Sequence, residues 1–304
     1  MINRHLYNGI SWIDVENPDR DDVKTLINEY DIDPLVCQEL LAPTMRPKVD
    51  LYKTYFYLVL HFPTINKSNG APVNQEIDFI LGKDFLITAH YNNIETLDMF
   101  AKVFEVKATL NKKDLGSHAG YVFFNMIKAL YEKMVDELDI INDKIEEIED
   151  DVFDGKEREM VEELSHVSRY LLDFKKALAL HHEILSSLQF VTQKIFEPAF
   201  QYYVRAIEGE YLKVESSIIS NRDSVKELRE TNNTLLQTKV NEVMKKFNIL
   251  AFVTFPLSLV AAIMSLESSG NPFKNGTINF WPIVFMFGFV VVGMIIYFKH
   301  KKWL

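Results

Sequence analysis

The sequence contains a single cysteine, Cys37, among 304 residues, so no disulfide can form within the chain. A reducing compartment such as the cytosol suits this usage. Residues 1–12 hold no apolar run of the kind a signal peptide needs, so we expect no cleaved leader. Positive charge is also scarce, because 33 Lys and Arg face 43 Asp and Glu and leave a net charge of −10. This balance argues against nucleic acid as a partner.

Motifs for catalysis and nucleotide binding are missing as well. The sequence has no P-loop, no glycine-rich dinucleotide fingerprint and no nucleophile elbow. His181, His182 and Glu183 resemble metal ligands, but consecutive helix positions cannot converge on one ion, so we interpret them as surface residues. We therefore expect no enzyme, no catalytic residue and no prosthetic group.

Two long stretches without charge lie near the C-terminus. Residues 247–266 and 280–298 contain 20 and 19 residues, close to the ~20 that cross a bilayer as a helix. Core helices of a soluble protein are the alternative. Lysines flank the pair on its outer sides, whereas the connection 267–279 holds only Lys274. By the positive-inside rule both chain ends are cytoplasmic, in a multi-pass protein of the cell (inner or plasma) membrane.

The first part of the chain reads as mixed α/β. Residues 54–65 and 75–91 are rich in β-branched and aromatic residues and predict strands. Asn17 and Pro18 predict the N-cap and the first residue of a helix. We expect an α/β domain over residues 1–118.

Long helices follow. Apolar residues recur at steps of three and four over 124–153 and again over 160–188, which predicts two amphipathic helices. The acidic run 146–154 fits either a solvated helix face or a cation site. We expect this helical region, residues 119–200, to pack on the α/β domain.

The next element is longer still. From Gln201 to residue 266 the pattern stays helical, with no proline before Pro256. Such a helix is roughly 100 Å long at ~1.5 Å per residue. We expect a stalk over 201–246 that continues into the first membrane span.

One face of this helix is polar below the membrane and small or polar within it. It follows a 3.5-residue repeat through Glu227, Glu230, Thr234, Gln237, Asn241, Met244, Asn248, Ala251, Phe255, Ser258 and Ala262. Polar groups in a span usually face a bundle interior or a watery cavity, so the face predicts a pore between copies of the chain. Acidic rings would attract cations, and Met244 and Phe255 would form apolar constrictions. The alternative is a face that simply meets water below an ordinarily packed span.

Several motifs in order also resemble one known family. They are "WIDVENPDRDDVKTLINEYDIDPLVCQELLAPTMRPKVD" (12–50), "YFYLVLHFP" (55–63), "IDFILGKDFLITAHY" (77–91), "KALYEKMVDELDIINDKIEEIEDDVF" (128–153), "NEVMK" (241–245), "TFPLSL" (254–259) and "YFKHKKWL" (297–304). The whole chain is thereby similar to the CorA family of magnesium channels.

The resemblance implies an α+β membrane protein that forms a homopentameric channel. Each protomer would have a cytosolic α/β domain, a long helical stalk and two transmembrane helices. Residues 247–266 would line the pore, 267–279 would form an external loop, 280–298 an outer span, and 299–304 a basic cytosolic tail. The family carries Mg²⁺, often Co²⁺ or Ni²⁺, inward. On matching positions, the conduction path would include Asn241, Met244, Phe247, Ala251, Phe255 and Ser258, with Glu230 as acidic ring and Lys299, Lys301 and Lys302 as a basic collar.

The chain departs from the family at the outer end of the first span. The family signature there is Gly-Met-Asn, and this chain has Ser265, Leu266 and Glu267. We hypothesise that the carboxylate of Glu267 forms a substitute entrance ring that selects cations by charge. The alternative is that Glu267 marks the water interface in a channel that has lost its filter.

A second departure concerns regulation. The family senses cytosolic Mg²⁺ through Asp residues near the start of the stalk, and this chain has Ala206 and Gly209 at those positions. Glu208 and Glu210 are adjacent candidates for a metal site, but they point elsewhere around the helix. Closure by Mg²⁺ is therefore not implied.

These features lead to one main hypothesis and two alternatives. The main hypothesis is Mg²⁺ uptake (with Co²⁺ or Ni²⁺) through a central pore, with a divalent cation as the transported ion and only a candidate regulator. One alternative is the zinc-transporting branch of the same family. The other is a non-conducting membrane scaffold or regulatory subunit.

Overall fold

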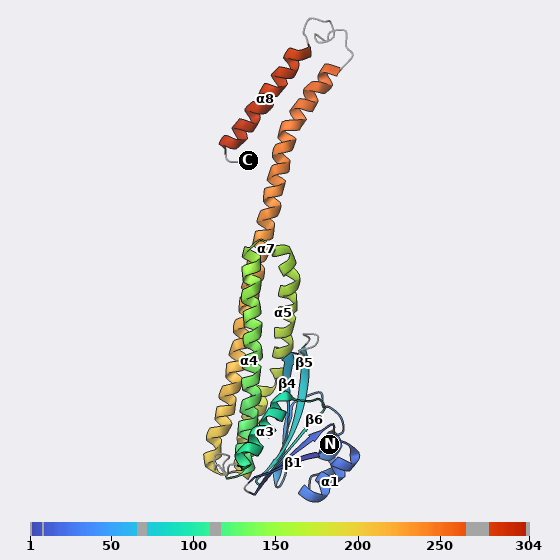
Figure 1. The fold of residues 1–304 in the computed structure, drawn as a ribbon, viewed down its shortest axis with the longest axis vertical. Coiled ribbons are helices and arrows are strands. Elements are labelled where there is room, and N and C mark those ends of the chain that lie inside the picture. The colour runs from blue at the N-terminus through green and yellow to red at the C-terminus, as the bar shows by residue number, and fades with distance from the viewer. Residues whose placement is uncertain (1, 8, 66–71, 110–116, 266–279, 302–304) are drawn as a thin grey trace. The chain divides into compact units, whose positions relative to one another are not determined.

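The computed structural model describes residues 2–7, 9–65, 72–109, 117–265 and 280–301. The chain divides into two compact units, Met1–Arg229 and Glu230–Leu304. The helix α7, Gln201–Ser265, begins in the first unit and ends in the second (Figure 1).

The first unit is built on a six-stranded mixed sheet in the order β1-β2-β6-β5-β4-β3. The parallel pair is β2 with β6, and the other neighbours are antiparallel. The strands are β1 (Ile2–Tyr7), β2 (Ile10–Glu16), β3 (Lys48–Leu51), β4 (Tyr55–Ile65), β5 (Pro72–Gly82) and β6 (Phe85–His90). The predicted strands near 54–65 and 75–91 are thus present, with the second region divided by a turn at Lys83 and Asp84.

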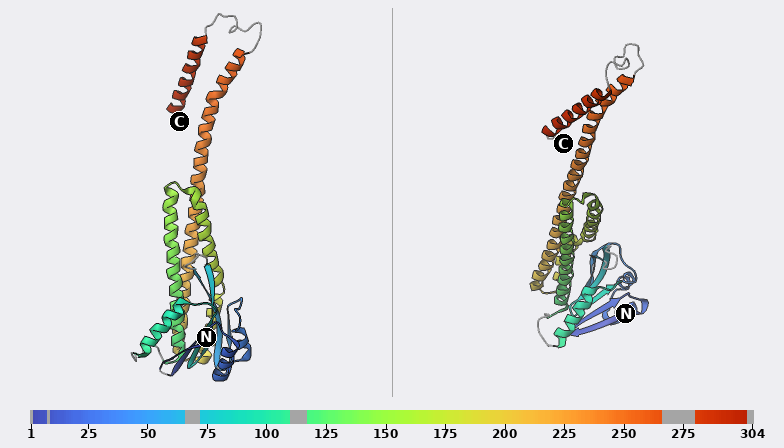
Figure 2. Two further views of the ribbon diagram at one scale, coloured as in Figure 1. Left: turned by 45° about the vertical axis from the view of Figure 1, so that its right-hand side comes forward. Right: turned by 45° about the horizontal axis from the view of Figure 1, so that its top comes forward.

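The sheet is covered on both faces, which explains why β4 is buried from Tyr55 to Pro63 instead of alternating. On one face, apolar residues of the strands pack with α1 (Arg20–Tyr30) and α2 (Pro34–Glu39). Figure 2 shows α1 and α3 (Glu95–Thr109) on opposite sides of the sheet.

The second face of the sheet packs on aromatic residues and on α4 (Ala119–Phe153). The ring of Phe123 on α4 lies 5.4 Å from that of Phe79 and 6.0 Å from that of Phe56, both edge-on. All three side chains are fully buried. Burial of each such ring contributes about 1.5–3 kcal/mol to stability, so this layer anchors α4 to the sheet.

The predicted N-cap of the first helix is wrong by two residues. The cap is Asp19, whose side chain accepts hydrogen bonds from the backbone N–H groups of Asp21 and Asp22. Asn17 has a φ of 48°, in the left-handed region, so it turns the chain before the helix begins. Asp22 completes a capping box by accepting from the backbone N–H of Asp19.

The predicted helix over 160–188 is also corrected. The structure has two helices there, α5 (Glu157–Leu178) and α6 (His181–Ile195), separated at Ala179 and Leu180. The break turns His181 into the core, where its exposed fraction is 0% and its Nδ1 lies 2.8 Å from Tyr131 Oη. The expectation that His181 is a surface residue is therefore wrong, because tertiary packing outweighs its local pattern.

Within the first unit, α7 packs against α4. Asn221 Nδ2 donates to the backbone oxygen of Leu138 at 3.0 Å, and Asn221 is buried. The helix continues without interruption past Pro256, so the predicted long helix from Gln201 is present as a single element. The second unit adds α8 (Phe280–His300).

Candidate functional site

The polar face predicted from the sequence lies on α7 within the second unit. Most of its members are exposed in the isolated chain, and Ala251 is half-buried. The members are Glu230, Thr234, Gln237, Asn241, Met244, Asn248, Ala251, Phe255, Ser258 and Ala262, with Phe247 beside them. Because an α-helix has 3.6 residues per turn, this face drifts around the helix by about 20° per heptad. Copies of α7 would have to supercoil for the face to stay on one axis.

The polar side chains of this face fall into two groups. Gln237 Nε2 donates to Asn241 Oδ1 at 3.1 Å, which links two carboxamides along the face. The hydroxyls of Thr234 and Ser258 instead donate to backbone oxygens one turn earlier, at 2.9 Å each. Carboxamide and hydroxyl oxygens are ligands that hard divalent cations accept, directly or through water.

The C-terminal part of α7, from Met244 onward, exposes large apolar side chains. Met244, Phe247 and Phe255 are 54%, 63% and 73% exposed. Among the described residues, one helix is long and apolar enough to cross a membrane, and it includes this part of α7. Only 6% of its most apolar stretch is buried within the chain, whereas a core helix of a soluble protein is mostly buried. The described part of α8 from Val284 is apolar but shorter.

The second unit contains a cavity between α7 and the C-terminal end of α8. Its volume is about 440 Å³, and Phe298 of α8 lines it together with residues of α7. Asn241, Met244 and Asn248 of the polar face are among those residues. A second cavity, of about 590 Å³, lies beside α7 at Pro256. Ala251 and Phe255 are among the residues that line it. Residues of the polar face therefore line two cavities, and the face is not closely packed within one chain.

The ends of the two predicted spans are described only in part. Ser265 is the last residue of α7, and its hydroxyl donates to the backbone oxygen of Ala261 at 2.9 Å. Leu266 and Glu267 lie outside the described residues, as does the expected external loop. Lys299 and Lys301 are exposed at the end of α8, and Lys302 is not described.

The two candidate metal ligands near the N-terminal end of α7 already have other partners. Glu208 accepts a hydrogen bond from Gln189 Nε2 at 2.9 Å, and Glu210 pairs with Lys213 at 2.8 Å. Two positions apart on a helix, they do not face each other. Across the residues that the structure describes, no cluster of three or more His, Cys, Asp or Glu could hold a metal ion.

The architecture defines a class of protein before any relative is considered. A mixed α/β unit joined by one long helix to an apolar, exposed segment is typical of a membrane protein with a large domain beside the membrane. The comparisons extend this. The chain belongs to the family of CorA-like Mg²⁺ transporter proteins, whose model matches residues 7–300, and so it is placed among ion-transport proteins.

Individual relatives agree with this assignment. The chain is 26% identical over 295 residues to the cobalt/magnesium transport protein CorA of Thermotoga maritima, covering 97% of this chain and 83% of the relative. The complete structure of the CorA magnesium transporter from Methanocaldococcus jannaschii shares the fold, with a TM-score of 0.85 at 17% identity over 97% of this chain and 92% of that one. The ZntB cytoplasmic domain from Vibrio parahaemolyticus is similar over 75% of this chain and 88% of its own length, with a TM-score of 0.62 at 15% identity.

Proposed function

We propose that the chain forms a homopentameric channel that carries divalent cations, Mg²⁺ first, into the cell. Each copy contributes two spans, with both chain ends in the cytosol. The observation that carries this proposal is the continuity of the polar face, which runs on one unbroken helix from Glu230 to Ser258. The relative from Thermotoga maritima is named a cobalt/magnesium transport protein, and this name points to the same ions.

In this proposal the parts of the chain have distinct roles. Residues 1–118 and 119–200 form the cytosolic domain, and 201–246 form the stalk. The acidic ring of Glu230 concentrates cations at the cytosolic mouth. The carboxamides of Gln237, Asn241 and Asn248 hold the ion through its water shell, because Mg²⁺ gives up water reluctantly. Met244, Phe247 and Phe255 narrow the path.

The entrance is formed by the last residues of the first span. Ser265 and Leu266 carry the backbone oxygens there, and Glu267 supplies a ring of carboxylates. The basic collar of Lys299, Lys301 and Lys302 surrounds the cytosolic side. Glu208 and Glu210 remain candidate regulatory ligands only if a cation displaces their present partners, Gln189 and Lys213.

Uptake into proteoliposomes tests the proposal. The purified protein is expected to take up Mg²⁺ and Co²⁺ down an imposed gradient. Glu267→Gln removes the charge at nearly constant size, so it should lower the rate about tenfold if the ring attracts cations electrostatically. Glu242→Gln, which lies off the polar face of α7, is the matched control. Unchanged uptake in Glu267→Gln removes this residue from the selectivity element.

The zinc-transporting alternative is favoured by the similarity to the ZntB cytoplasmic domain and by the altered signature. Uptake into the same proteoliposomes distinguishes zinc transport from magnesium transport, because Zn²⁺ would then enter faster than Mg²⁺. If an assembled pentamer passes none of the three ions, the chain is a non-conducting scaffold and the channel proposal is lost.

A further inference from the structure

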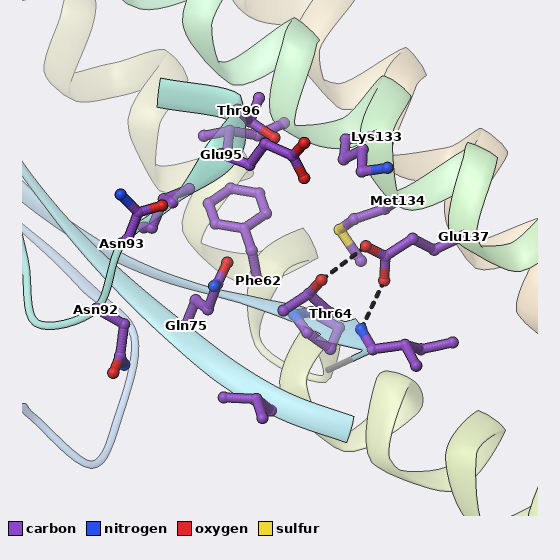
Figure 3. Close-up of a pocket in the computed structure, with 15 residues that line it drawn as sticks. Phe62, Thr64, Gln75, Asn92, Asn93, Glu95, Thr96, Lys133, Met134 and Glu137 are labelled. Atoms are coloured by element: carbon purple, nitrogen blue, oxygen red, sulfur yellow. Dashed lines mark hydrogen bonds between the residues drawn. The ribbon is translucent and has the colours of Figure 1, made fainter. Parts of the chain in front are cut away.

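A cavity of about 380 Å³ lies in the first unit, and none of the residues that line it belongs to α7. Its walls come from the ends of β4 and β5, the loop between β6 and α3, the first turn of α3, and α4 (Figure 3). Pockets that bind small molecules begin at about this volume. Nothing in the transport cycle proposed above uses it.

One wall is held by the loop after β6. The ring of His90 is bonded at both nitrogens, with Nδ1 2.6 Å from the backbone oxygen of Asn92 and Nε2 3.3 Å from Asp14 Oδ2. Asn93 Nδ2 donates to Asp98 Oδ2 at 3.0 Å, which joins the loop to α3. The loop is therefore positioned before any ligand arrives.

The opposite wall is held by Glu137 on α4. Its two carboxylate oxygens accept hydrogen bonds from Thr64 Oγ1 at 2.6 Å and from the backbone N–H of Ile65 at 2.8 Å. Only 7% of Glu137 is exposed. With both walls tied, the cavity stays open instead of collapsing.

Several polar side chains of the cavity have no partner among the described residues. Within the described part of the chain, the side chains of Gln75, Asn92, Thr96 and Lys133 make no hydrogen bond or ion pair. Polar groups that converge on a cavity without protein partners are those that a ligand or water satisfies. Their donors and acceptors come from β5, the loop after β6, α3 and α4.

The charges in the cavity have opposite signs. Lys133 comes from α4, and the carboxylate of Glu95 is directed from the start of α3 toward α4 (Figure 3). A simple anion would meet the carboxylates of Glu95 and Glu137, and a simple cation would meet Lys133. The apolar side chains of Phe62 and Met134 lie beside these charged groups (Figure 3). This combination suits a molecule that carries both charges and an apolar group.

We propose that this cavity binds a small zwitterion of the amino-acid type with an apolar side chain. Its carboxylate pairs with Lys133, and its ammonium group pairs with Glu95 in place of the partner that Glu95 has in the structure. Its side chain lies over Phe62 and Met134, and the amide of Gln75 orients it. Such a ligand joins the sheet to α4, so it stabilises the folded unit in proportion to its occupancy.

The test uses full-length protein in detergent and three probes of the same shape. L-Leucine carries both charges, 4-methylpentanoate lacks the ammonium group, and 3-methylbutylamine lacks the carboxylate. Calorimetry at ligand concentrations up to about 20 mM detects even a millimolar Kd. L-Leucine alone should bind saturably and raise the Tm. Lys133→Met and Glu95→Gln should each weaken binding about tenfold, since each removes one charge pair.

Matched controls lie on the same helix as Lys133. Lys128→Met and Glu132→Gln change an exposed ion pair of α4 and should leave binding unchanged. If Lys133→Met does not fold, Lys133→Gln replaces it. Absence of saturable L-leucine binding, equal binding of the three probes, or binding unaffected by both cavity variants would overturn the proposal. None of these results depends on ion conduction.

Discussion

At the scale of single residues, burial sets the protonation of several groups in the sheet. Asp78 on β5 is 1% exposed and shares a face of the strand with Glu76. Burial, and then the negative charge of Glu76, raises the pKa of Asp78 well above its usual range. Tyr91 Oη lies 3.3 Å from Asp78 Oδ2 and provides a polar contact there. Asp78 thus keeps its proton in the folded chain at pH values where the unfolded chain has lost it.

The substitution Asp78→Asn is therefore expected to stabilise the protein above neutral pH. The folded state binds the proton more tightly than the unfolded chain, whose Asp pKa is about 3.9, so wild-type stability falls as pH rises above that value. Asparagine cannot ionise, so the fall should be smaller and the Tm at pH 8 higher by about 2–4 °C. Thermal unfolding across this range measures the difference. Asp136→Asn, an exposed change on α4, is the control, and equal slopes in the two variants would contradict the assignment.

His181 has the opposite dependence. Burial lowers the pKa of His181 to about 3, so the ring is neutral in the folded chain. The unfolded chain takes up the proton near its ordinary pKa of about 6.5, so stability is complete above that value and declines as pH falls toward 3. His181→Gln should flatten the decline between about pH 6.5 and 5, a window above the titration of most carboxylates. Exposed His166→Gln should keep the wild-type slope in the same melts; a shared slope in both variants would refute the argument.

At the scale of elements, α4 connects the sheet to the long helices. Its buried face packs on the aromatic layer of the sheet, and its backbone at Leu138 accepts the Asn221 side chain of α7. Glu137 ties it to the end of β4 through two hydrogen bonds. A bond between a carboxylate and a backbone N–H in a buried setting is among the stronger hydrogen bonds.

Loss of this carboxylate has a predictable cost. Glu137→Ala leaves the Ile65 N–H and the Thr64 hydroxyl without their acceptor, which should lower the free energy of unfolding by about 1–3 kcal/mol. Denaturant titration of the purified protein measures it. Glu132→Ala on the same helix, where the side chain is 57% exposed, should cost much less. Similar losses in the two variants would show that the two hydrogen bonds are not what anchors α4.

At the scale of the whole molecule, the proposed pore exists only between copies of the chain. One α7 cannot enclose a path, and its Met244 and Phe255 are largely exposed in the single chain. Apolar rings around a narrow path exclude water and so hold back ions. The assembled state would therefore give these residues a role that a single chain cannot show.

A polar side chain in place of either apolar ring should make the channel leak. Met244→Ser or Phe255→Ser should raise Mg²⁺ flux in proteoliposomes at least about twofold, because a polar ring stays wet where an apolar ring does not. Phe252→Ser, also exposed on α7 but off the polar face, is the control. A flux unchanged in both ring variants while Glu267→Gln alters it would locate the constriction elsewhere.

Much of the fold could be predicted because its signals are local. The strand composition of 54–65 and the uninterrupted helical pattern from Gln201 both appear in the structure. A run of β-branched and aromatic residues or a helix of this length depends on neighbours in the sequence, so it can be recognised there. The CorA resemblance, now shown by the match over residues 7–300, rested on such runs in order.

Other features could not be predicted because they depend on contacts between distant segments. The break before His181 follows from its place beside Tyr131, 50 positions earlier in the chain. The cavity beside Glu137 joins residues of β4, β5, α3 and α4 that no local pattern brings together. The N-cap at Asp19 is an exception, because its capping box with Asp22 depends only on neighbouring residues and could have been predicted from the sequence. The Asn17-Pro18 pair favoured the wrong position.

By itself, the sequence determined the strands near 54–65 and 75–91, the long helix from Gln201 and the apolar composition of its last part, because each follows from the pattern along one segment. The order of its motifs also indicated the CorA family. The tertiary structure alone decided which ionisable groups are buried, that His181 belongs to the core, and that polar side chains of opposite charge surround a cavity in the first unit. Burial and cavity shape depend on packing between segments, and that packing has no signature within any one of them.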